Sequence, residues 1–320
     1  MTPQHLLTRR KILATAAAAT AIGAGTSAFA QSGQRVLRVG HQKGWFNILK
    51  GRGTLEQKLA PLGVKVSWIE FNAGPVQLEA LNVGSIDFGD VGEAPPIFAQ
   101  AAGTPLVYAG ATQPRPKLEA LILPPGSPVK TVADLKGKRV AFNKGSNVQY
   151  FLAKLLEKKG LKYTDVQTVF LSPPDARAAF EKGAIDAWVI WDPFLAAAQK
   201  QLGAQILADA QGVVNNRLYY FTSRDYATNN TDVLKIALKE VDEVEKWISK
   251  NKDAAAVELS KVLGLDKSIT ELFINRTPFG IVPVNSDILA EQQQIADTFL
   301  ELKLLPKALN LRHAAPVNLG

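Results

Sequence analysis

The sequence predicts an α/β protein of two lobes, each a mainly parallel sheet flanked by helices, with a helical C-terminal tail packed on the first lobe. Short β-like segments alternate with helical ones over residues 36–208, a pattern typical of parallel sheets covered by helices. From residue 231 onward the pattern is almost entirely helical, so this tail has no sheet of its own. The chain has 320 residues, enough for roughly two domains.

The first lobe begins with a strand over residues 36–41. In the next strand, Val64, Val66 and Trp68 occupy alternate positions and so share one face. Pro75 suits the first turn of a helix that Gly84 ends. The elements expected in this lobe are strands over 36–41, 64–71, 86–89 and 106–111, helices over 53–62, 75–83 and 97–101, and a glycine-rich turn after residue 89.

The second lobe repeats the same order of elements. Gly137 stops a helical turn over 132–135, and Gly145, Ser146 and Asn147 open a longer helix. The remaining elements are strands over 120–123, 139–143, 166–171, 185–190 and 204–208, and helices over 147–159, 174–182 and 193–202.

Four helices are expected in the tail, over 232–250, 253–263, 268–275 and 286–301. The most economical path crosses between the lobes twice, near residues 117–120 and 221–224, and these crossings would form a hinge. The expected division is a signal peptide over 1–30, the first part of lobe 1 over 31–118, lobe 2 over 119–221 and the second part of lobe 1 over 222–320.

The N-terminus is typical of an export signal. Arg9, Arg10 and Lys11 precede an alanine-rich apolar stretch over 12–22, and Ala28-Phe29-Ala30 fits the small-x-small cleavage rule, so the mature chain would begin at residue 31. The paired arginines suggest twin-arginine export, with an ordinary Sec signal as the alternative. The apolar stretch is too short and weak for a membrane span. We therefore expect a periplasmic location.

Composition excludes several kinds of chemistry. The chain has no cysteine and 3 histidines, so disulfides, thiolate metal sites and cysteine nucleophiles are absent. The net charge of +8 is spread along the chain without a long basic run, which argues against nucleic acid and modestly favours anionic ligands. No serine has a credible histidine base and no Walker-type loop occurs. We expect no catalytic residues, no metal and no cofactor.

Ligands of open α/β sheets collect at the carboxyl ends of strands. One such loop holds Gly145, which allows close backbone approach, and Ser146, which can cap the next helix and offer a hydroxyl. The helix start at Asn147 favours an anion, although a plain helix cap remains the alternative. A second loop holds Gly92, Glu93 and Ala94. The Glu93 backbone could donate to an anion, while its carboxylate could pair with Lys144 or a ligand ammonium, or only stabilise a helix N-terminus.

Other loop residues complete the candidate site. Trp45 and Trp191 follow strands and could line an apolar slot, and Gln42 could donate to an oxyanion. Asp192 precedes a proline, and an aspartate in that position most often caps the helix that follows. His41 is expected to end the first strand and to have a structural role. The predicted ligand-binding residues are Gln42, Trp45, Asp90, Gly92, Glu93, Ala94, Gly145, Ser146, Asn147, Trp191 and Asp192.

Several segments resemble the aliphatic-sulfonate-binding proteins of ABC importers. The resemblance runs from about residue 37 to about residue 317 and is carried by 37–44, 71–75, 78–87, 95–103, 132–138, 144–146, 176–180 and 186–193. It implies a type II periplasmic-binding-protein fold, closure of the two lobes on the ligand, and a permease and ATPase complex as partner. It also implies uptake of an alkanesulfonate for sulfur supply by a protein expected to be a monomer.

Position by position, the resemblance implies that the ligand contacts Gln42, the turn 92–94, the pair 146–147 and Trp191. Two departures lie at this site: Asp90-Val91, where relatives commonly have small or hydroxylated residues, and Asn147-Val148 after Ser146. A sulfonate stays ionised, so donors at two helix starts, one in each lobe, would suit it. The alternatives are taurine, whose ammonium Asp90 or Glu93 could face, nitrate or a thiamine-pyrimidine precursor as ligand, or an enzyme of pyrimidine synthesis. Relatives with that activity use a His/Cys-rich segment, which this chain does not have.

Overall fold

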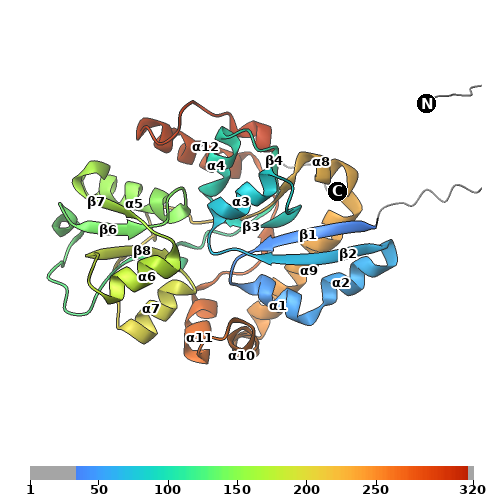
Figure 1. Cartoon of the computed structure of the whole chain (residues 1–320), viewed down its shortest axis with the longest axis horizontal. Coiled ribbons are helices and arrows are strands. Elements are labelled where there is room, and N and C mark those ends of the chain that lie inside the picture. The colour runs from blue at the N-terminus through green and yellow to red at the C-terminus, as the bar shows by residue number, and fades with distance from the viewer. Residues whose placement is uncertain (1–33, 316–320) are drawn as a thin grey trace, which may run out of the picture. The chain divides into compact units, whose positions relative to one another are not determined.

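The computed structural model describes residues 34–315, which fold into two sheets with helices around them (Figure 1). The predicted signal peptide over 1–30 lies outside the described residues. No helix within the described part is long and apolar enough to cross a membrane.

The first sheet is mixed, with strand order β11-β4-β10-β3-β1-β2. The parallel pairs join β1 to β2 and to β3, and β10 runs antiparallel between β3 and β4. The strands are β1 (Arg35–His41), β2 (Val64–Glu70), β3 (Phe88–Gly92), β4 (Leu106–Thr112), β10 (Leu218–Ser223) and β11 (Ile281–Val282).

The second sheet repeats this plan on a smaller scale, with strand order β7-β6-β8-β5-β9. Its parallel pairs join β6 to β7 and to β8, and β5 runs antiparallel between β8 and β9. The strands are β5 (Glu119–Leu123), β6 (Arg139–Phe142), β7 (Gln167–Phe170), β8 (Ala187–Trp191) and β9 (Gln205–Asp209). The predicted two-lobed α/β class is confirmed. Strand β10 in the first sheet and β5 in the second run antiparallel to both of their neighbours, and the edge strand β11 also runs antiparallel to β4.

The second passage between the sheets differs from the prediction. The chain leaves the second sheet after β9 and enters the first as β10, so it crosses over residues 210–217 rather than near 221–224. Residues 218–221, which we placed in lobe 2, pair with β3 and β4 of the first sheet. Hydrogen bonding on both edges holds this strand in the middle of the first sheet.

Helices flank both sheets (Figure 1). The stretch after Gly44, predicted as a loop, is helix α1 (Trp45–Arg52), which begins where the Gly44 N–H donates to Asn47 Oδ1 at 3.0 Å. Gly53, at φ +63°, separates α1 from the next helix. The others are α2 (Thr54–Leu59), α3 (Gly74–Asn82) and α4 (Pro95–Ala101) in the first lobe, and α5 (Asn147–Lys158), α6 (Pro173–Glu181) and α7 (Phe194–Leu202) in the second.

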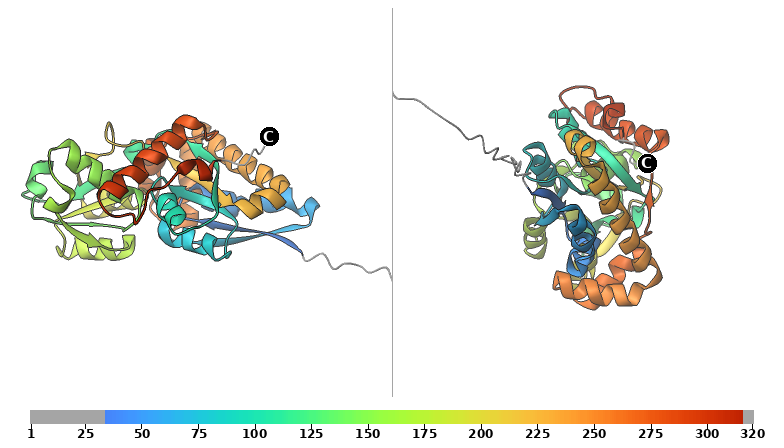
Figure 2. Two further views of the ribbon diagram at one scale, coloured as in Figure 1. Left: turned by 90° about the horizontal axis from the view of Figure 1, so that it is seen from above. Right: turned by 90° about the vertical axis from the view of Figure 1, so that its right-hand side faces the viewer.

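The C-terminal helices contact both lobes rather than the first alone (Figures 1 and 2). Helices α9 (Thr231–Lys250) and α10 (Lys252–Leu263) pack on α1 of the first lobe. Helix α11 (Lys267–Arg276) packs on α7 of the second lobe, and α12 (Ser286–Glu301) contacts both α4 and α5. The short α8 (Arg224–Asn229) joins β10 to α9. The tail therefore bridges the lobes.

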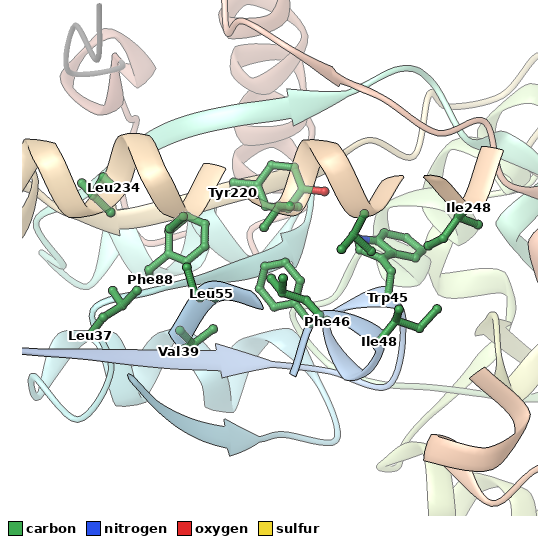
Figure 3. Packing of buried hydrophobic residues seen from close by; sticks show 14 of the residues in the cluster. Leu37, Val39, Trp45, Phe46, Ile48, Leu55, Phe88, Tyr220, Leu234 and Ile248 are labelled. Atoms are coloured by element: carbon green, nitrogen blue, oxygen red, sulfur yellow. The ribbon is translucent and has the colours of Figure 1, made fainter. Parts of the chain in front are cut away.

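A large apolar cluster lies between the first sheet and helices α1, α2 and α9 (Figure 3). Phe46, Phe88 and Tyr220 form a stack in its middle, with ring centroids 6.1 to 6.4 Å apart. Each ring is at most 1% exposed. This packing fixes the first turn of α1, and with it Trp45 at the edge of the cluster.

Candidate functional site

A pocket of about 660 Å³, partly open to solvent, lies where strand ends of the two sheets meet. Aromatic rings and a few polar and charged side chains line it, as is typical of sites for small organic ligands. Residues from both lobes and from both crossings line it. They are Gln42, Lys43, Gly44, Trp45, Gly74, Asp90, Gly92, Pro95, Arg115, Leu118, Ser146, Asn147, Trp191, Asp192, Asn216, Arg217, Leu218 and Phe273.

Most of the predicted ligand-binding residues line this pocket. Those that do are Gln42, Trp45, Asp90, Gly92, Ser146, Asn147, Trp191 and Asp192. The pocket lining does not include Glu93, Ala94 or Gly145. Parallel strand ends share one edge of a sheet, which is why loops far apart in sequence meet here.

Arg115 is the main lining residue that the sequence argument missed. It is 4% exposed, its Nε has no hydrogen-bond partner, and its guanidinium lies 4.7 Å from the centre of the Trp45 ring. Among residues 34–315 it forms no ion pair with a carboxylate. Burial lowers its pKa, while Glu245 and Asp90 act in the opposite direction. A buried cation without a partner favours an anion in the pocket.

A sequence signal for Arg115 existed. The residue follows β4, so it lies at the same carboxyl edge as the loops that we did select. The run Pro114-Arg115-Pro116 lies between the strand predicted over 106–111 and the crossing predicted near 117–120, and it received no role. An arginine after a predicted central strand is a candidate ligand residue by the same topological rule.

Asp90 lies inside β3, not in the turn where we expected it. It pairs with Tyr220 of β10, the strand missing from the prediction, and this pairing extends β3 to Gly92. The side chain is buried and Oδ1 has no hydrogen-bond partner. Burial raises the pKa of Asp90 to about 7, against the opposing charge of Arg115.

Glu93 turns away from the pocket. Its Oε2 accepts from the backbone N–H of Arg217 at 3.0 Å, and its side chain lines a second cavity with Glu291 of α12. Burial raises the pKa of Glu93 to about 8. Lys144, an expected partner, instead lies 5.5 Å from the centre of the Phe170 ring. The structure therefore contradicts the predicted pairing of Glu93 with Lys144, and it removes the Glu93 carboxylate from the pocket.

The start of α5 is built differently from the expectation. Ser146 precedes the helix, but its hydroxyl caps no helix N–H and donates to the Asn143 carbonyl at 2.6 Å. The Gly145 N–H donates to Gln149 Oε1 at 2.6 Å and is therefore already used. The Asn147 amide donates to Glu119 and, at 3.1 Å, to Asn216 Oδ1. These contacts occupy the polar side chains that we had assigned to an anion.

Gly92 and Asn147 bring the lobes into contact at the pocket. A Cβ atom on Gly92 would lie 2.7 Å from Asn147 Oδ1, which is shorter than real contacts allow. Only glycine permits this approach of β3 to the first residue of α5. Ala94 is fully buried just before α4, in a cluster that includes residues of both lobes.

Two helix starts border the pocket, but one of them is not the helix we expected. Helix α4 begins with Pro95 and Pro96, which have no N–H to donate. Helix α1 begins at Trp45, beside the lining residues Lys43 and Gly44. The donors in the first lobe are thus those of α1, and α5 supplies those of the second.

Aromatic rings form the apolar wall. Trp45 is 6% exposed, packs on Phe273 and has no partner for its Nε1. Trp191 ends β8, is half-buried and meets Phe194 edge to face. Gln42 donates to Gln77 Oε1 at a long 3.3 Å. The wall offers apolar surface with few polar groups, as in small-molecule sites.

Asp192 has a structural role, as predicted. Its Oδ1 accepts from the N–H of Ala196 at 2.8 Å in the first turn of α7, and its Oδ2 lies 3.1 Å from Arg276 of α11. Burial raises the pKa of Asp192 to about 6, although Arg276 opposes this. His41 ends β1 and is buried, with Nδ1 3.1 Å from the Gln42 carbonyl, also as predicted.

The pocket has one unpaired buried cation and one unpaired buried carboxylate. Arg217 pairs with Glu291 and Asp192 pairs with Arg276. This leaves Arg115 and Asp90, with the half-buried Lys43 nearby on the lining. Within the described part of the chain, no group of three or more His, Cys, Asp or Glu residues could hold a metal ion.

Two mixed sheets joined by two crossings, with a pocket between their strand ends, define a two-lobed solute-binding protein. The sequence matches the family described as NMT1/THI5 like over residues 60–255. It is 43% identical over 285 residues to a protein of Escherichia coli strain K12 named as an aliphatic sulfonates-binding protein, covering 88% of this chain and 89% of that one. The chain therefore belongs to the NMT1/THI5-like family and, within it, to the aliphatic sulfonates-binding proteins.

Two solved structures agree with this placement. The alkanesulfonate-binding protein SsuA from Xanthomonas axonopodis pv. citri, bound to MOPS, is 38% identical with a TM-score of 0.84, covering 88% of this chain and 97% of that one. The periplasmic aliphatic sulphonate binding protein SsuA from Escherichia coli is 42% identical with a TM-score of 0.79, covering 88% and 91%. The predicted family and fold class are confirmed.

Proposed function

We propose that the protein is a periplasmic solute-binding protein that captures aliphatic sulfonates and delivers them to an ABC importer for sulfur acquisition. The observation that carries the proposal is Arg115, a buried and unpaired guanidinium on the wall of the pocket between the lobes. Membership of the sulfonate-binding family supports the choice of anion.

The chemistry of a sulfonate fits these surroundings. It remains ionised at physiological pH and carries no proton, so it needs donors and positive charge only. Arg115 offers a planar set of N–H donors, and Trp45 Nε1 is a buried donor without a partner. The first N–H groups of α1 and α5 favour negative charge. Charge-assisted hydrogen bonds of this kind are the strong ones.

The organic tail of the ligand would lie on the apolar wall. Trp45, Trp191 and Phe273 present ring surface to the pocket, and Leu118 and Leu218 extend it. The Xanthomonas relative was solved with MOPS, a propanesulfonate that carries a morpholine ring. A tail of that size needs a wall of this kind, whereas nitrate and sulfate do not use it.

Binding would hold the lobes together. The pocket takes residues from both sheets and from both crossings, so a ligand touches both lobes only when they are close. Arg115 and Asn216 lie on the crossings themselves, which act as the hinge in this proposal. The closed, ligand-bound form is the one that the permease and ATPase complex would receive, and we propose that the protein acts as a monomer.

Two alternatives from the sequence lose support at Arg115. A thiamine-pyrimidine precursor has no anionic group to satisfy a buried guanidinium. An enzyme of pyrimidine synthesis would use a His/Cys-rich segment, and this sequence has no cysteine. We therefore propose binding without chemistry. Taurine, which is itself a sulfonate, remains compatible.

Thermal unfolding of the mature chain, residues 31–320, tests the proposal. A ligand that binds only the folded state raises the midpoint by mass action. We expect alkanesulfonates of increasing chain length to give increasing shifts, with no shift from sulfate or nitrate. Equal shifts from all anions would contradict the apolar wall, and no shift from any sulfonate would contradict the function.

A further inference from the structure

Two oppositely charged side chains are buried in the pocket, and each has one polar atom without a hydrogen-bond partner. Arg115 is 4% exposed with an unpartnered Nε, and Asp90 is 7% exposed with an unpartnered Oδ1. They lie close enough for each to influence the pKa of the other, yet in the described chain they form no ion pair. A pocket that contains a buried positive charge and a buried negative charge, neither of them in an ion pair, is complementary to a ligand that carries one charge of each sign.

A ligand that is only an anion satisfies half of this site. Its sulfonate would neutralise Arg115 but would also lie near the Asp90 carboxylate, and like charges in a desolvated pocket repel strongly. Glu245 of α9 adds a further negative charge nearby, although Tyr220 and the Gly280 N–H hold it. Asp90 must then either take up a proton or meet a positive charge on the ligand.

We propose that the preferred ligands are zwitterions, alkanesulfonates that carry a protonated amine on the tail. The sulfonate binds Arg115 and the helix starts, and the ammonium donates to Asp90 Oδ1. This inference rests on the proposed function and names the ligand class for the same pocket. No covalent bond is made or broken, and Asp90 accepts the ammonium as an ionised carboxylate.

The other carboxylate on the pocket lining cannot take the amine. Asp192 lines the pocket, but both of its oxygens are held, by Ala196 and by Arg276. Glu93 is on the far side of its turn, where its side chain lines a second cavity. Asp90 is therefore the specificity-determining residue.

Matched ligand pairs test the inference by isothermal titration calorimetry at pH 7. The pairs are propane-1-sulfonate with 3-aminopropane-1-sulfonate, and ethanesulfonate with 2-aminoethanesulfonate, with propylamine alone as a control. We expect the amino member of each pair to bind about tenfold tighter or better, as a charge-assisted hydrogen bond at a buried site allows. Propylamine alone should not bind measurably.

The Asp90→Asn variant locates the effect because asparagine keeps the size of the side chain and removes its charge. The preference for the amino ligand should disappear, while propane-1-sulfonate binds as well as before or better. Glu93→Gln is the matched control: it removes a neighbouring buried carboxyl, and the preference should persist. Thermal unfolding of each variant shows that it is folded.

The possible failures are distinct. If plain sulfonates bind as tightly as amino-sulfonates, or if Asp90→Asn keeps the preference, the zwitterion inference is overturned and the proposed function stands. If plain sulfonates bind more tightly as the pH falls through 7 and amines give no gain, Asp90 takes up a proton instead. If no sulfonate binds, both proposals are overturned.

Discussion

Four carboxyl groups around the pocket lie almost entirely out of water: Asp90, Glu93, Glu119 and Asp192. Burial disfavours the charged form of each and raises its pKa, to about 7 for Asp90, about 8 for Glu93 and about 6 for Asp192. Glu93 also raises the pKa of Glu119, so negative charge at one opposes ionisation of the other. The folded protein therefore holds protons that the unfolded chain releases.

This proton binding predicts how stability depends on pH. A group whose pKa is raised by folding stabilises the folded state below its unfolded pKa, and that stability is lost as the pH rises through the folded pKa. We expect the free energy of unfolding to fall between about pH 4 and pH 8, measured by urea unfolding. Glu93→Gln should remove roughly 2–4 kcal/mol of that fall.

The exposed Glu301→Gln change serves as the control, since a solvated carboxylate should leave the pH slope as it is. A free energy of unfolding that rises over this range would contradict the raised pKa values. The raised pKa values would also be contradicted if the free energy of unfolding of Glu93→Gln depended on pH as steeply as that of the native chain.

At single residues, sequence reasoning found the right loops but not the direction of every side chain. Gln42, Trp45 and Trp191 line the pocket as predicted because they follow strand ends. Whether a side chain such as Glu93 faces the pocket or the reverse side depends on its register and neighbours, which spacing does not reveal. Arg115 was missed because it lies in the short stretch between the strand predicted over 106–111 and the crossing predicted near 117–120, which received no role.

At the scale of elements, long periodic segments were predictable and short ones were not. The long helices α5, α9 and α12 appear within a residue or two of their predicted bounds. The eight residues of α1 follow the short loop 42–44 and carry little periodic signal. Strand β10 contains three consecutive aromatic residues, 219–221, and its place between β3 and β4 is set by long-range pairing. Its absence from the prediction shifted the second crossing.

One ion pair connects the C-terminal helices to the second lobe. Arg276 of α11, with its side chain 14% exposed, pairs with the fully buried Asp192 carboxylate between β8 and α7. Removing one partner of a buried pair leaves an uncompensated charge and strongly destabilises a protein. We expect Arg276→Met to lower the free energy of unfolding by about 3 kcal/mol in urea unfolding.

A second change checks the cause of that loss. Adding Asp192→Asn to Arg276→Met removes the stranded charge, so the double variant should regain part of the lost stability. Arg177→Met breaks an exposed pair with Glu181 and should cost less than about 1 kcal/mol. Equal losses for Arg276→Met and Arg177→Met would show that burial of the pair is unimportant.

At the scale of the whole molecule, the pocket exists because the chain passes twice between two sheets. The crossings place Arg115 and Asn216 at the floor shared by both lobes, and α11 and α12 reach across from one lobe to the other. Alternating strands and helices predicted this architecture, since few other arrangements cover two such sheets. The close approach of the lobes at Gly92 and Asn147 depends on contacts between individual atoms, which the alternation of strands and helices in the sequence does not predict.

The central claim is that Arg115 holds a sulfonate in the pocket between the lobes. The most direct test is calorimetric titration of propane-1-sulfonate into the native mature chain and into Arg115→Met, with Arg177→Met as control. Loss of a buried charge partner should weaken binding by about 30-fold or more, with binding by the control unchanged. Equal affinities for the native chain and for Arg115→Met, when thermal unfolding shows both to be folded, would contradict the account.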